Sequence, residues 1–479
     1  MRLTVVLLTA LLAAPLGGNA QWAPGTRAAA APRVPRVSFD GPALTYDFPA
    51  VQIGAAEYEE GPTGATVLLF RKPVMAAVDV RGGAPGTIFT DLLRLGSDKF
   101  FVSAITLAGG SAYGLSVATG VANALKERAA NPGNWKNIAV VPGAIIFDLG
   151  LRRYNSVTPD ETLGRAALDG ARSGWAPLGA RGAGRFAMQG YYFGRDEWQH
   201  SGQGAAFRRS GETKVLVITV VNAAGSVVDR KGRLMRCSHP VAGDCGAISE
   251  RLAQHLAALG AAKRADSNAP KPSEPAATST PTTNTTITVV VTNQALPFWA
   301  LQRLAVQVHN SMARAIQPFG TEVDGDTLFA VSTGEVSNAG LNNVDLGTLA
   351  SETAWDAVLA SAPARADAAP RTGAALTSAL ADACIGRYEL APGSVAELRR
   401  NGAGLEVEVT GQDSVYLPAG KWLPLTLVAS DEFELATPRA DRLHIDRDAR
   451  GLIAGFTINP GLWPVTALRL PRTVEPESE

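Results

Sequence analysis

The chain has 479 residues, with 44 Lys and Arg side chains balancing 44 Asp and Glu side chains, and 46% of its residues are hydrophobic. This balance excludes the basic footprint of a nucleic-acid-binding protein and the polybasic patch of a membrane-surface protein. The length predicts two or three domains. Three cysteines and five histidines lie scattered, without metal-ligand spacing or an evident histidine-dependent triad, so we expect no metal and no cofactor.

Residues 1–20 carry one arginine, an apolar run and then small residues. This order is typical of a signal peptide cleaved after Ala20. An uncleaved membrane anchor is the alternative, although the run is short for a spanning helix. We therefore expect a periplasmic or secreted protein that leaves the membrane once the signal is removed. In an oxidising compartment Cys237 and Cys245 could form a disulfide or stay as two thiols, and Cys384 is left over.

An Ala/Pro/Arg-rich leader, 21–36, precedes a series of strand-like and helix-like segments. Short apolar runs bounded by turn residues predict buried strands. Apolar residues spaced three and four apart predict helices. The expected elements are strands at 65–70 and 75–80, a loop at 81–87, a helix at 112–128, a strand, break and strand at 137–149, a strand, turn and strand at 214–229, and a helix at 248–264.

The composition changes abruptly at 265–284, which is rich in Pro, Ser and Thr and is predicted to be a disordered linker. The linker ends directly at TTITVVVTN, 285–293, whose β-branched residues predict a strand. We expect a helix around 301–315, a loop entering a strand at 324–334 and a helix at 345–362.

A second Ala/Pro/Arg-rich linker, 363–375, separates the preceding segments from a different pattern. Beyond it, short β-type segments are separated by turn residues at regular intervals. This spacing predicts a small antiparallel barrel or curled sheet over 376–479. The segment 37–362 is then the main domain.

The junction between Asn284 and Thr285 is chemically informative. A threonine hydroxyl is a poor nucleophile near neutral pH and needs a base within hydrogen-bond reach. The α-amine of an N-terminal threonine is such a base, with an unperturbed pKa of about 8. This amine is released only when the Asn284–Thr285 bond is cut, and the same hydroxyl can attack the Asn284 carbonyl in an N-to-O acyl shift. An ordinary surface loop at the junction is the alternative.

Seven sequence blocks together resemble the L-aminopeptidase/D-esterase and β-aminopeptidase family of self-processing N-terminal-nucleophile hydrolases, from about residue 50 to 362. The blocks are EEGPTGATVLLF, AAVDVRGGAPGT, LAGGSAYGLSVATGVANAL, VVPGAIIFDL, VVNAAGSVVD, NTTITVVVTN and DGDTLFAVSTG. The resemblance implies an α+β fold, a four-layer αββα sandwich, and the small antiparallel β domain at the C-terminus lies outside it. It also implies autocatalytic cleavage at 284/285, two tightly associated fragments and a homo-oligomer.

The resemblance assigns roles to individual residues. Thr285 would be the nucleophile of the mature enzyme. Asn222 matches the asparagine that donates to the oxyanion, a role that suits a neutral amide, although it could instead be a turn residue. Asp324 and Asp326 fall where a serine and a glutamate orient the nucleophile in the family. Asp326 keeps the carboxylate and Asp324 replaces a hydroxyl, while the alternative is that both are turn residues.

The expected substrate pocket departs from the aminopeptidase pattern. Those enzymes carry a Glu-Thr-Tyr-Asp run, whose Glu holds the substrate amine and whose Tyr assists the reaction. This chain has Ile145, Ile146, Phe147 and Asp148 at these places. Because Ile145 cannot pair with an ammonium and Phe147 has no hydroxyl, either Asp148 or Asp79 would hold the amine, or the substrate has no free amine.

Glycine-rich loops complete the predicted pocket. Gly82–Gly83 and Gly109–Gly110–Ser111 could form its backbone walls. The amides of Gly110 and Ser111 could bind a substrate carboxylate or an oxyanion at a helix N-terminus. For the Ser111 side chain we favour a helix N-cap over a catalytic role.

Three functions fit this pattern. The leading one is an autocatalytically cleaved hydrolase that acts on peptide, amide or ester bonds of small substrates. The second is an acyltransferase of the ornithine acetyltransferase type, in which an amine takes the acyl group in place of water. The third is a processed but non-catalytic binding or assembly protein.

Overall fold

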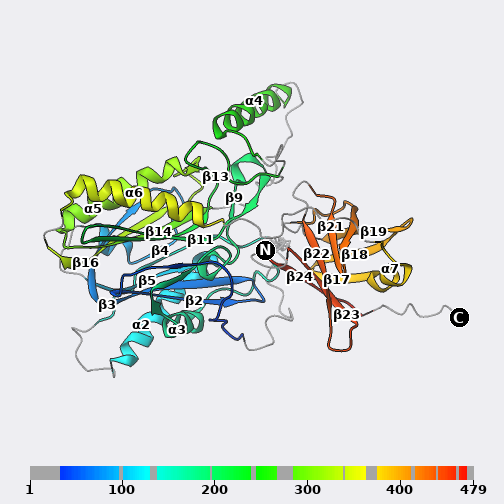
Figure 1. Cartoon of the computed structure of the whole chain (residues 1–479), viewed down its shortest axis with the longest axis horizontal. Coiled ribbons are helices and arrows are strands. Elements are labelled where there is room, and N and C mark those ends of the chain that lie inside the picture. Colours follow the sequence, from blue (N-terminus) through cyan, green and yellow to red (C-terminus); the bar gives the residue numbers. More distant parts are fainter. Residues whose placement is uncertain are drawn as a thin grey trace, which may run out of the picture.

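The computed structural model describes residues 33–95, 101–129, 138–150, 152–194, 197–238, 244–266, 284–337, 340–362, 375–411, 416–437, 441–459 and 463–471. The predicted signal peptide, nearly all of the leader and most of both predicted linkers lie outside the described residues. Figure 1 shows two bodies: helices packed on mixed sheets up to residue 362, and a barrel beyond residue 375.

A mixed ten-stranded sheet forms the centre of the first body. Along its path lie β11 (Gln203–Ser210), β12 (Thr213–Asn222), β14 (Thr285–Gln294), β16 (Thr327–Val336), β3 (Thr63–Val80), β5 (Val102–Ala108), β6 (Gly143–Ile145) and β4 (Thr87–Ile88). Beside β3, β2 (Val51–Tyr58) adds a strand that also pairs with β7 (Arg172–Ser173). β14 runs parallel to β16 and β5 runs parallel to β6, whereas the other pairs are antiparallel.

The long strand β3 belongs to two sections of this sheet. Its first half pairs with β2 and β5, and its end, from Met75 to Val80, pairs with β16. Between the two halves, Arg71 and Lys72 are exposed. The sequence predicted two separate strands here because this polar stretch looks like a break. It is instead the place where one continuous strand leaves one section and enters the other.

A core of apolar side chains lies between the two sections. It combines residues of the first section with residues of the second, such as Ile53, Leu68 and Ile105 with Ile218, Val289 and Phe329. On the outer side of the second section pack α5 (Phe298–Ser311) and α6 (Asn343–Ala360). Against β2, β3 and β5 pack α2 (Ser116–Arg128) and α3 (Glu161–Asp169), on the opposite side of the body (Figure 1).

The sequence predicted most of these elements, with local corrections. The expected helix at 112–128 begins as a 3-10 helix, Ser111–Leu115, and continues as α2. The expected pair of strands at 137–149 contributes only β6. Other short elements of this body include α1 (Thr90–Arg94), β1 (Ala43–Thr45), β8 (Trp175–Pro177), β9 (Met188–Gln189), β10 (Gln199–His200), β13 (Ser226–Val227) and β15 (Ile316–Gln317).

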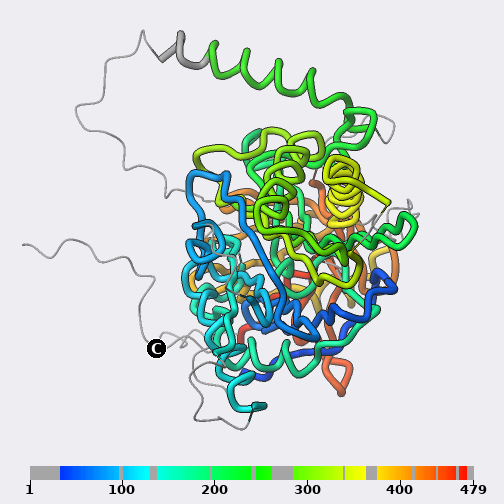
Figure 2. The backbone as a smooth tube through the Cα atoms, turned by 90° about the vertical axis from the view of Figure 1, so that its left-hand side faces the viewer, coloured from blue at the N-terminus to red at the C-terminus, as the bar shows by residue number. Residues whose placement is uncertain are grey.

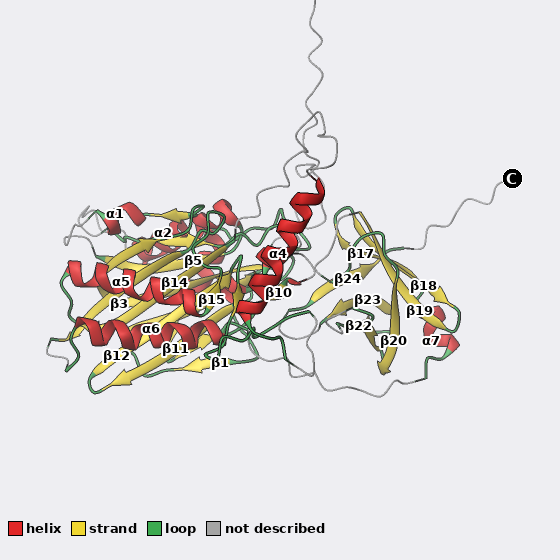
Figure 3. Ribbon diagram, turned by 90° about the horizontal axis from the view of Figure 1, so that it is seen from above, coloured by secondary structure: helices red, strands yellow, loops and turns green. Residues whose placement is uncertain are grey.

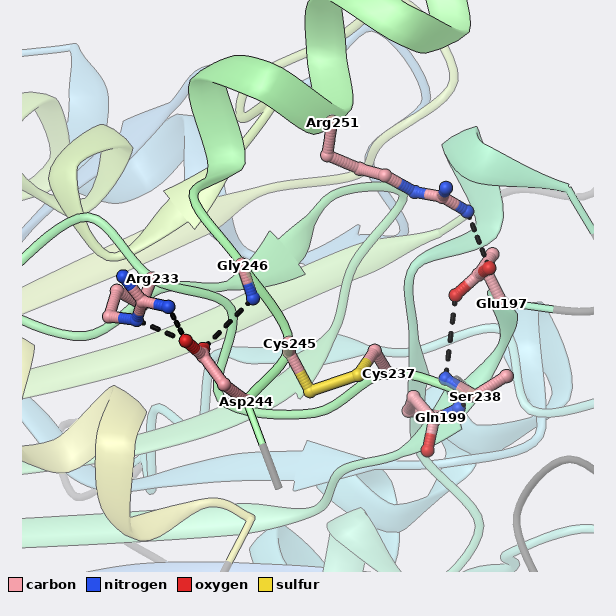
Figure 4. The surroundings of a disulfide bond; sticks show 9 residues. All are labelled: Glu197, Gln199, Arg233, Cys237, Ser238, Asp244, Cys245, Gly246 and Arg251. Carbon is pink, nitrogen blue, oxygen red and sulfur yellow. Dashed lines mark hydrogen bonds and ion pairs between the residues drawn. A yellow bond between two sulfur atoms is a disulfide. The ribbon is translucent and has the colours of Figure 1, made fainter. Parts of the chain in front are cut away.

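The helix before the predicted cleavage linker, α4 (Ile248–Asp266), projects away from the body (Figures 2 and 3). Its base is fastened by the disulfide between Cys237 and Cys245 and by an ion pair between Arg251 and Glu197 (Figure 4). The pairing that the sequence left open is therefore formed. No helix in the described part of the chain is both long enough and apolar enough to cross a membrane.

The second body is a closed barrel in which every neighbouring pair of strands is antiparallel. Its strands are β17 (Gly386–Ala391), β18 (Ser394–Asn401), β19 (Gly404–Gly411), β20 (Leu423–Ala429), β21 (Glu432–Leu435), β22 (Arg442–Arg447), β23 (Ile453–Ile458) and β24 (Val465–Arg469). The short helix α7 (Ser378–Cys384) precedes them. Apolar side chains such as Leu398, Phe433 and Phe456 fill the interior, so the predicted small β domain is confirmed as a barrel.

Candidate active site around Thr285

The candidate catalytic residues meet at one edge of the central sheet. Thr285 is the first residue of β14, and Asn222, the last residue of β12, lies directly opposite it in the antiparallel register. β16 runs parallel to β14, so the loop that enters β16, with Asp324 and Asp326, reaches the same edge. Strand direction therefore brings together residues from three segments that are far apart in the sequence.

The peptide bond between Asn284 and Thr285 is held by two donors. The Thr285 hydroxyl Oγ1 donates to the carbonyl oxygen of Asn284 at 2.6 Å. The backbone N–H of Gly325 donates to the same oxygen, with an N···O distance of 2.7 Å. The hydroxyl thus lies beside the carbonyl that it would attack, and an amide hydrogen polarises that carbonyl.

Gly325 allows this close approach because it has no side chain. A Cβ at this position would lie 2.7 Å from Thr285 Oγ1 and 2.7 Å from the backbone oxygen of Ala84. A Cβ on Gly82 would lie 2.2 Å from the backbone oxygen of Asp324. The predicted glycine loop at 81–87 therefore packs against the aspartate loop, and both need glycine where their backbones touch.

The Asp326 carboxylate holds the start of β14. It accepts the backbone N–H of Thr286 at 2.6 Å and that of Gly320 at 3.0 Å, and it is fully buried. Burial and the neighbouring charge of Asp324 raise the pKa of Asp326 to about 8, although the two N–H groups act in the opposite direction. This carboxyl group therefore keeps its proton to a higher pH than an ordinary aspartate.

The Asp324 side chain ties its own loop to the loop that follows β12. Its Oδ1 accepts the N–H of Ala224, just beyond Asn222, at 3.1 Å. Its Oδ2 accepts both the N–H and the hydroxyl of Thr321. Because both carboxylate oxygens bond to loop groups, this side chain fixes the position of the loop that carries Gly325.

Asn222 is 3% exposed, and both ends of its side-chain amide are held. Its Nδ2 donates to the backbone oxygen of Phe147 at 3.0 Å, and its Oδ1 accepts the N–H of Met188 at 3.0 Å. These bonds fix which end of the amide faces which way. Phe147, predicted to line the pocket, thus reaches the site through its backbone as well as its half-buried ring.

Asp148 and Gly110 have structural partners in place of the predicted substrate contacts. Asp148 accepts the Thr63 hydroxyl at 2.7 Å and the Gly110 N–H at 2.7 Å, and it forms a buried ion pair with Arg152 at 3.5 Å. The Gly110 amide is therefore already engaged, and a substrate ammonium would have to displace a guanidinium to reach Asp148.

The expected cap at Ser111 is wrong. Gly110, with a φ of 81°, occupies the N-cap position of the 3-10 helix, and no side chain caps it. The backbone N–H of Ser111 donates to the oxygen of Ile146 at 3.0 Å. Neither amide predicted to bind an oxyanion or carboxylate is directed at Thr285.

Asp79, the other candidate amine anchor, is also engaged. Its Oδ2 accepts from Arg81 Nε at 2.6 Å and lies 2.9 Å from His309 Nδ1. Burial raises the pKa of Asp79, but the bonds from His309 and Arg81 outweigh it and leave the pKa below its usual value. The carboxylate is thus a charged partner for groups of its own chain.

The sequence did not point to the backbone N–H groups of Gly325 and Met188. A glycine between two aspartates is typical of a turn, and only the register of β14 against β16 places its amide on the Asn284 carbonyl. In the part of the chain that the structure describes, no group of three or more His, Cys, Asp or Glu side chains could hold a metal ion.

Comparison with known proteins agrees with the sequence blocks. The profile of peptidase family S58 matches residues 43–383. A 6-aminohexanoate-oligomer endohydrolase of Paenarthrobacter ureafaciens is 41% identical over 329 residues, which cover 66% of this chain and 85% of that protein. One from Kocuria sp. (strain KY2) is 40% identical over 341 residues, covering 67% of this chain and 86% of that protein.

Among solved structures, a Burkholderia sp. beta-aminopeptidase matches with a TM-score of 0.45 and 18% identity, covering 68% of this chain and 89% of that chain. The sequence matches cover most of the first body and most of each relative, and they decide the family to which the chain belongs. The chain belongs to peptidase family S58 and is a hydrolase of amide bonds.

Proposed function

We propose that the chain cleaves its own Asn284–Thr285 bond and that the exposed Thr285 then hydrolyses internal amide bonds of small oligomeric substrates. The observation that carries this proposal is the pair of donors, Thr285 Oγ1 and Gly325 N–H, on the one carbonyl oxygen of Asn284. A buried hydroxyl beside a polarised carbonyl is the arrangement that an N-to-O acyl shift needs.

Self-cleavage proceeds in two stages, an N-to-O acyl shift and the hydrolysis of the resulting ester. Thr285 Oγ bonds to the carbonyl carbon of Asn284 while its proton passes to the Thr285 nitrogen, and Gly325 N–H stabilises the oxyanion. The carbon–nitrogen bond then breaks, which leaves Asn284 as an ester on Thr285. The α-amine of Thr285 is free from that point, and water then hydrolyses the ester, releasing the carboxylate of Asn284 and the Thr285 hydroxyl.

In the mature enzyme the new α-amine acts as the base for the Thr285 hydroxyl. Asp326, which bonds to the next N–H of the strand, and Asp324 orient this amine and the loop around it. Asn222, opposite Thr285 in the register, donates to the oxyanion of the substrate. The acyl group is carried as an ester on Thr285 and transferred to water.

The substrate we propose has no free amine beside the bond that is cut. Ile145 is apolar and buried, Asp148 pairs with Arg152, and Asp79 pairs with Arg81. An aminopeptidase needs a carboxylate that is open to the substrate ammonium, and none of these positions offers one. The two relatives compared above are endohydrolases of 6-aminohexanoate oligomers by name, and cleavage within a chain requires no such anchor.

We also propose a layered architecture for the first body and a location outside the cytoplasm. The two sheet sections around one core, with helices on both outer sides, support a four-layer αββα sandwich. The signal-like residues 1–20 and the disulfide between Cys237 and Cys245 support export to the periplasm or the medium. We also expect the two fragments to stay together within a homo-oligomer, as the family resemblance implies.

The direct test is N-terminal sequencing of the purified protein after denaturing electrophoresis, for wild type, Thr285→Ala and Thr286→Ala. We expect wild type and Thr286→Ala to give two fragments, the smaller starting at Thr285, and Thr285→Ala to remain one chain. Hydrolysis of a linear 6-aminohexanoate oligomer is expected only from the cleaved proteins. An intact wild-type chain that hydrolyses the oligomer would overturn the proposed nucleophile.

A further inference from the structure

The barrel lies outside the family match, which ends at residue 383. It nevertheless packs against the part of the first body that holds Asn222. Phe186 and the half-buried Met188 belong to the same apolar cluster as the barrel interior. Met188 is also the residue whose N–H donates to Asn222 Oδ1. The barrel therefore contacts a direct partner of the proposed oxyanion donor.

A first connection runs through Trp463, which precedes β24. Its indole Nε1 donates to the backbone oxygen of Ser201 at 2.6 Å. The Ser201 hydroxyl donates to the oxygen of Val221, the residue before Asn222. Two successive hydrogen bonds thus join a barrel side chain to the backbone that carries Asn222.

A second connection runs through His200. Its ring packs between Phe186 of the first body and two barrel residues, Tyr416 and Trp463, with the Trp463 ring stacked at 5.8 Å between centroids. His200 lies opposite Met188 in the pairing of β10 with β9. The same barrel surface therefore also positions the strand whose N–H holds the Asn222 amide.

The seam between barrel and first body, formed by Trp463, His200 and Ser201, is buried and hydrogen-bonded. Trp463 is 4% exposed, and Ser201 is fully buried. Hydrogen bonds in such surroundings are strong and their donors have no water to turn to. A catalytic donor must be held close to its productive position, since small displacements cost large factors in rate. The seam supplies this restraint from outside the family domain.

We propose that the barrel positions Asn222, with Trp463 as the positioning residue, so that the appended domain sets the rate of substrate turnover. The inference rests on the proposed function, because it requires Asn222 to donate to the substrate oxyanion. It also separates two activities of the chain. Self-cleavage uses the Gly325 amide, whose loop is also held by bonds within 320–326, and so we expect it to depend far less on Trp463.

The test compares Trp463→Phe with wild type, using p-nitrophenyl acetate and a linear 6-aminohexanoate oligomer as probes. Phenylalanine keeps an aromatic ring against His200 and removes the donor to Ser201. We expect kcat to fall about ten-fold, a fraction of the hundred-fold or larger loss typical of deleting an oxyanion donor. KM should stay within about two-fold and self-cleavage should proceed at the wild-type rate. Ser201→Ala, which breaks the next bond, should give the same pattern.

Matched controls separate positioning from a general loss of structure. Trp422→Phe changes another barrel tryptophan, whose ring contacts Arg399 of the barrel, and should leave kcat unchanged. In the Asn222→Ala background, Trp463→Phe should cause no further fall, because the group on which it acts is gone. An equal fall in that background, or an unchanged kcat in Trp463→Phe, would overturn the inference. An Asn222→Ala enzyme with full kcat would instead overturn the proposed role of Asn222.

Discussion

Strand β14 and the barrel strand β20 bury their side chains in different ways. All ten residues of β14 are buried, because one face meets the core between the sheet sections and the other meets the helices. In β20, Leu423 and Leu425 point into the barrel, whereas Pro424 and Thr426 are exposed. A barrel strand buries a side chain only at every second place, whereas a strand that is covered on both faces buries every one.

A polar residue therefore has a different energetic consequence in each of the two strands. In β20 a threonine on the outer face costs little. In β14 a buried threonine loses its contact with water and must find a partner. Thr288 pairs with Thr219, and Thr285 donates to Asn284. Thr288 thus has a partner on the neighbouring strand, whereas the Thr285 hydroxyl lies at the bond that we propose is cut.

The largest effect that we predict on stability concerns the barrel interior. Phe456 is fully buried and its ring lies 5.1 Å from that of Tyr388. Phe456→Ala should cost about 3–5 kcal/mol of barrel stability, the usual loss for a buried aromatic ring. Urea unfolding followed by tryptophan fluorescence measures this loss, with the exposed Leu452→Ala as control. Self-cleavage should be normal in both variants, and its loss in Phe456→Ala would contradict the separation of packing from chemistry.

The comparison also explains how far the sequence could predict the molecule. Short β-type segments separated by turn residues at regular intervals predicted the barrel, and the β-branched run after the linker predicted β14. The continuity of β3 was missed, because the exposed Arg71 and Lys72 mark a passage between sheet sections that only the assembled fold creates. The candidate side chains at this edge were predicted through the family resemblance and the structure brings them together, but the partners of Asp148 come from distant parts of the chain, including Thr63.

The roles of backbone N–H groups could not be predicted from the sequence. No residue type signals that its N–H will meet a particular carbonyl, so Gly325 and Met188 could not be assigned from the chain alone. The seam between barrel and Asn222 was hidden for the same reason. Trp463 and Ser201 are ordinary residues in sequence, and their contact depends on how two domains pack.

The next largest effect should come from Gly325→Ala. A methyl group here would lie 2.7 Å from Thr285 Oγ1, so it must displace either the hydroxyl or the amide that polarises the Asn284 carbonyl. We expect self-cleavage to slow by about a hundred-fold, as when a single oxyanion donor is lost. Electrophoresis during cell-free synthesis measures the rate. Gly340→Ala, with open space at its Cβ, is the control and should cleave itself at the wild-type rate. Equal cleavage rates in the two variants would show that the Gly325 amide does not take part in self-cleavage.

The smallest predicted effect is on the pH dependence of self-cleavage. Deprotonated, Asp326 accepts the N–H groups of Thr286 and Gly320; protonated, it turns a hydroxyl toward one of these donors and loosens the start of β14. Because its pKa is raised to about 8, the rate should rise about ten-fold between about pH 7 and pH 9 as the carboxylate forms. Asp326→Asn should process slowly and without this rise.

The same group should affect folding in the opposite direction. Above about pH 4 the unfolded chain has released this proton, whereas the folded precursor keeps it up to about pH 8. The folded state thus binds more protons in this window, so its stability falls as the pH rises. Urea unfolding of the uncleaved Thr285→Ala chain at several pH values should show this fall, and adding Asp326→Asn should reduce it. A cleavage rate that rises while stability falls distinguishes titration at Asp326 from a general loosening of the fold, which would move both in the same direction.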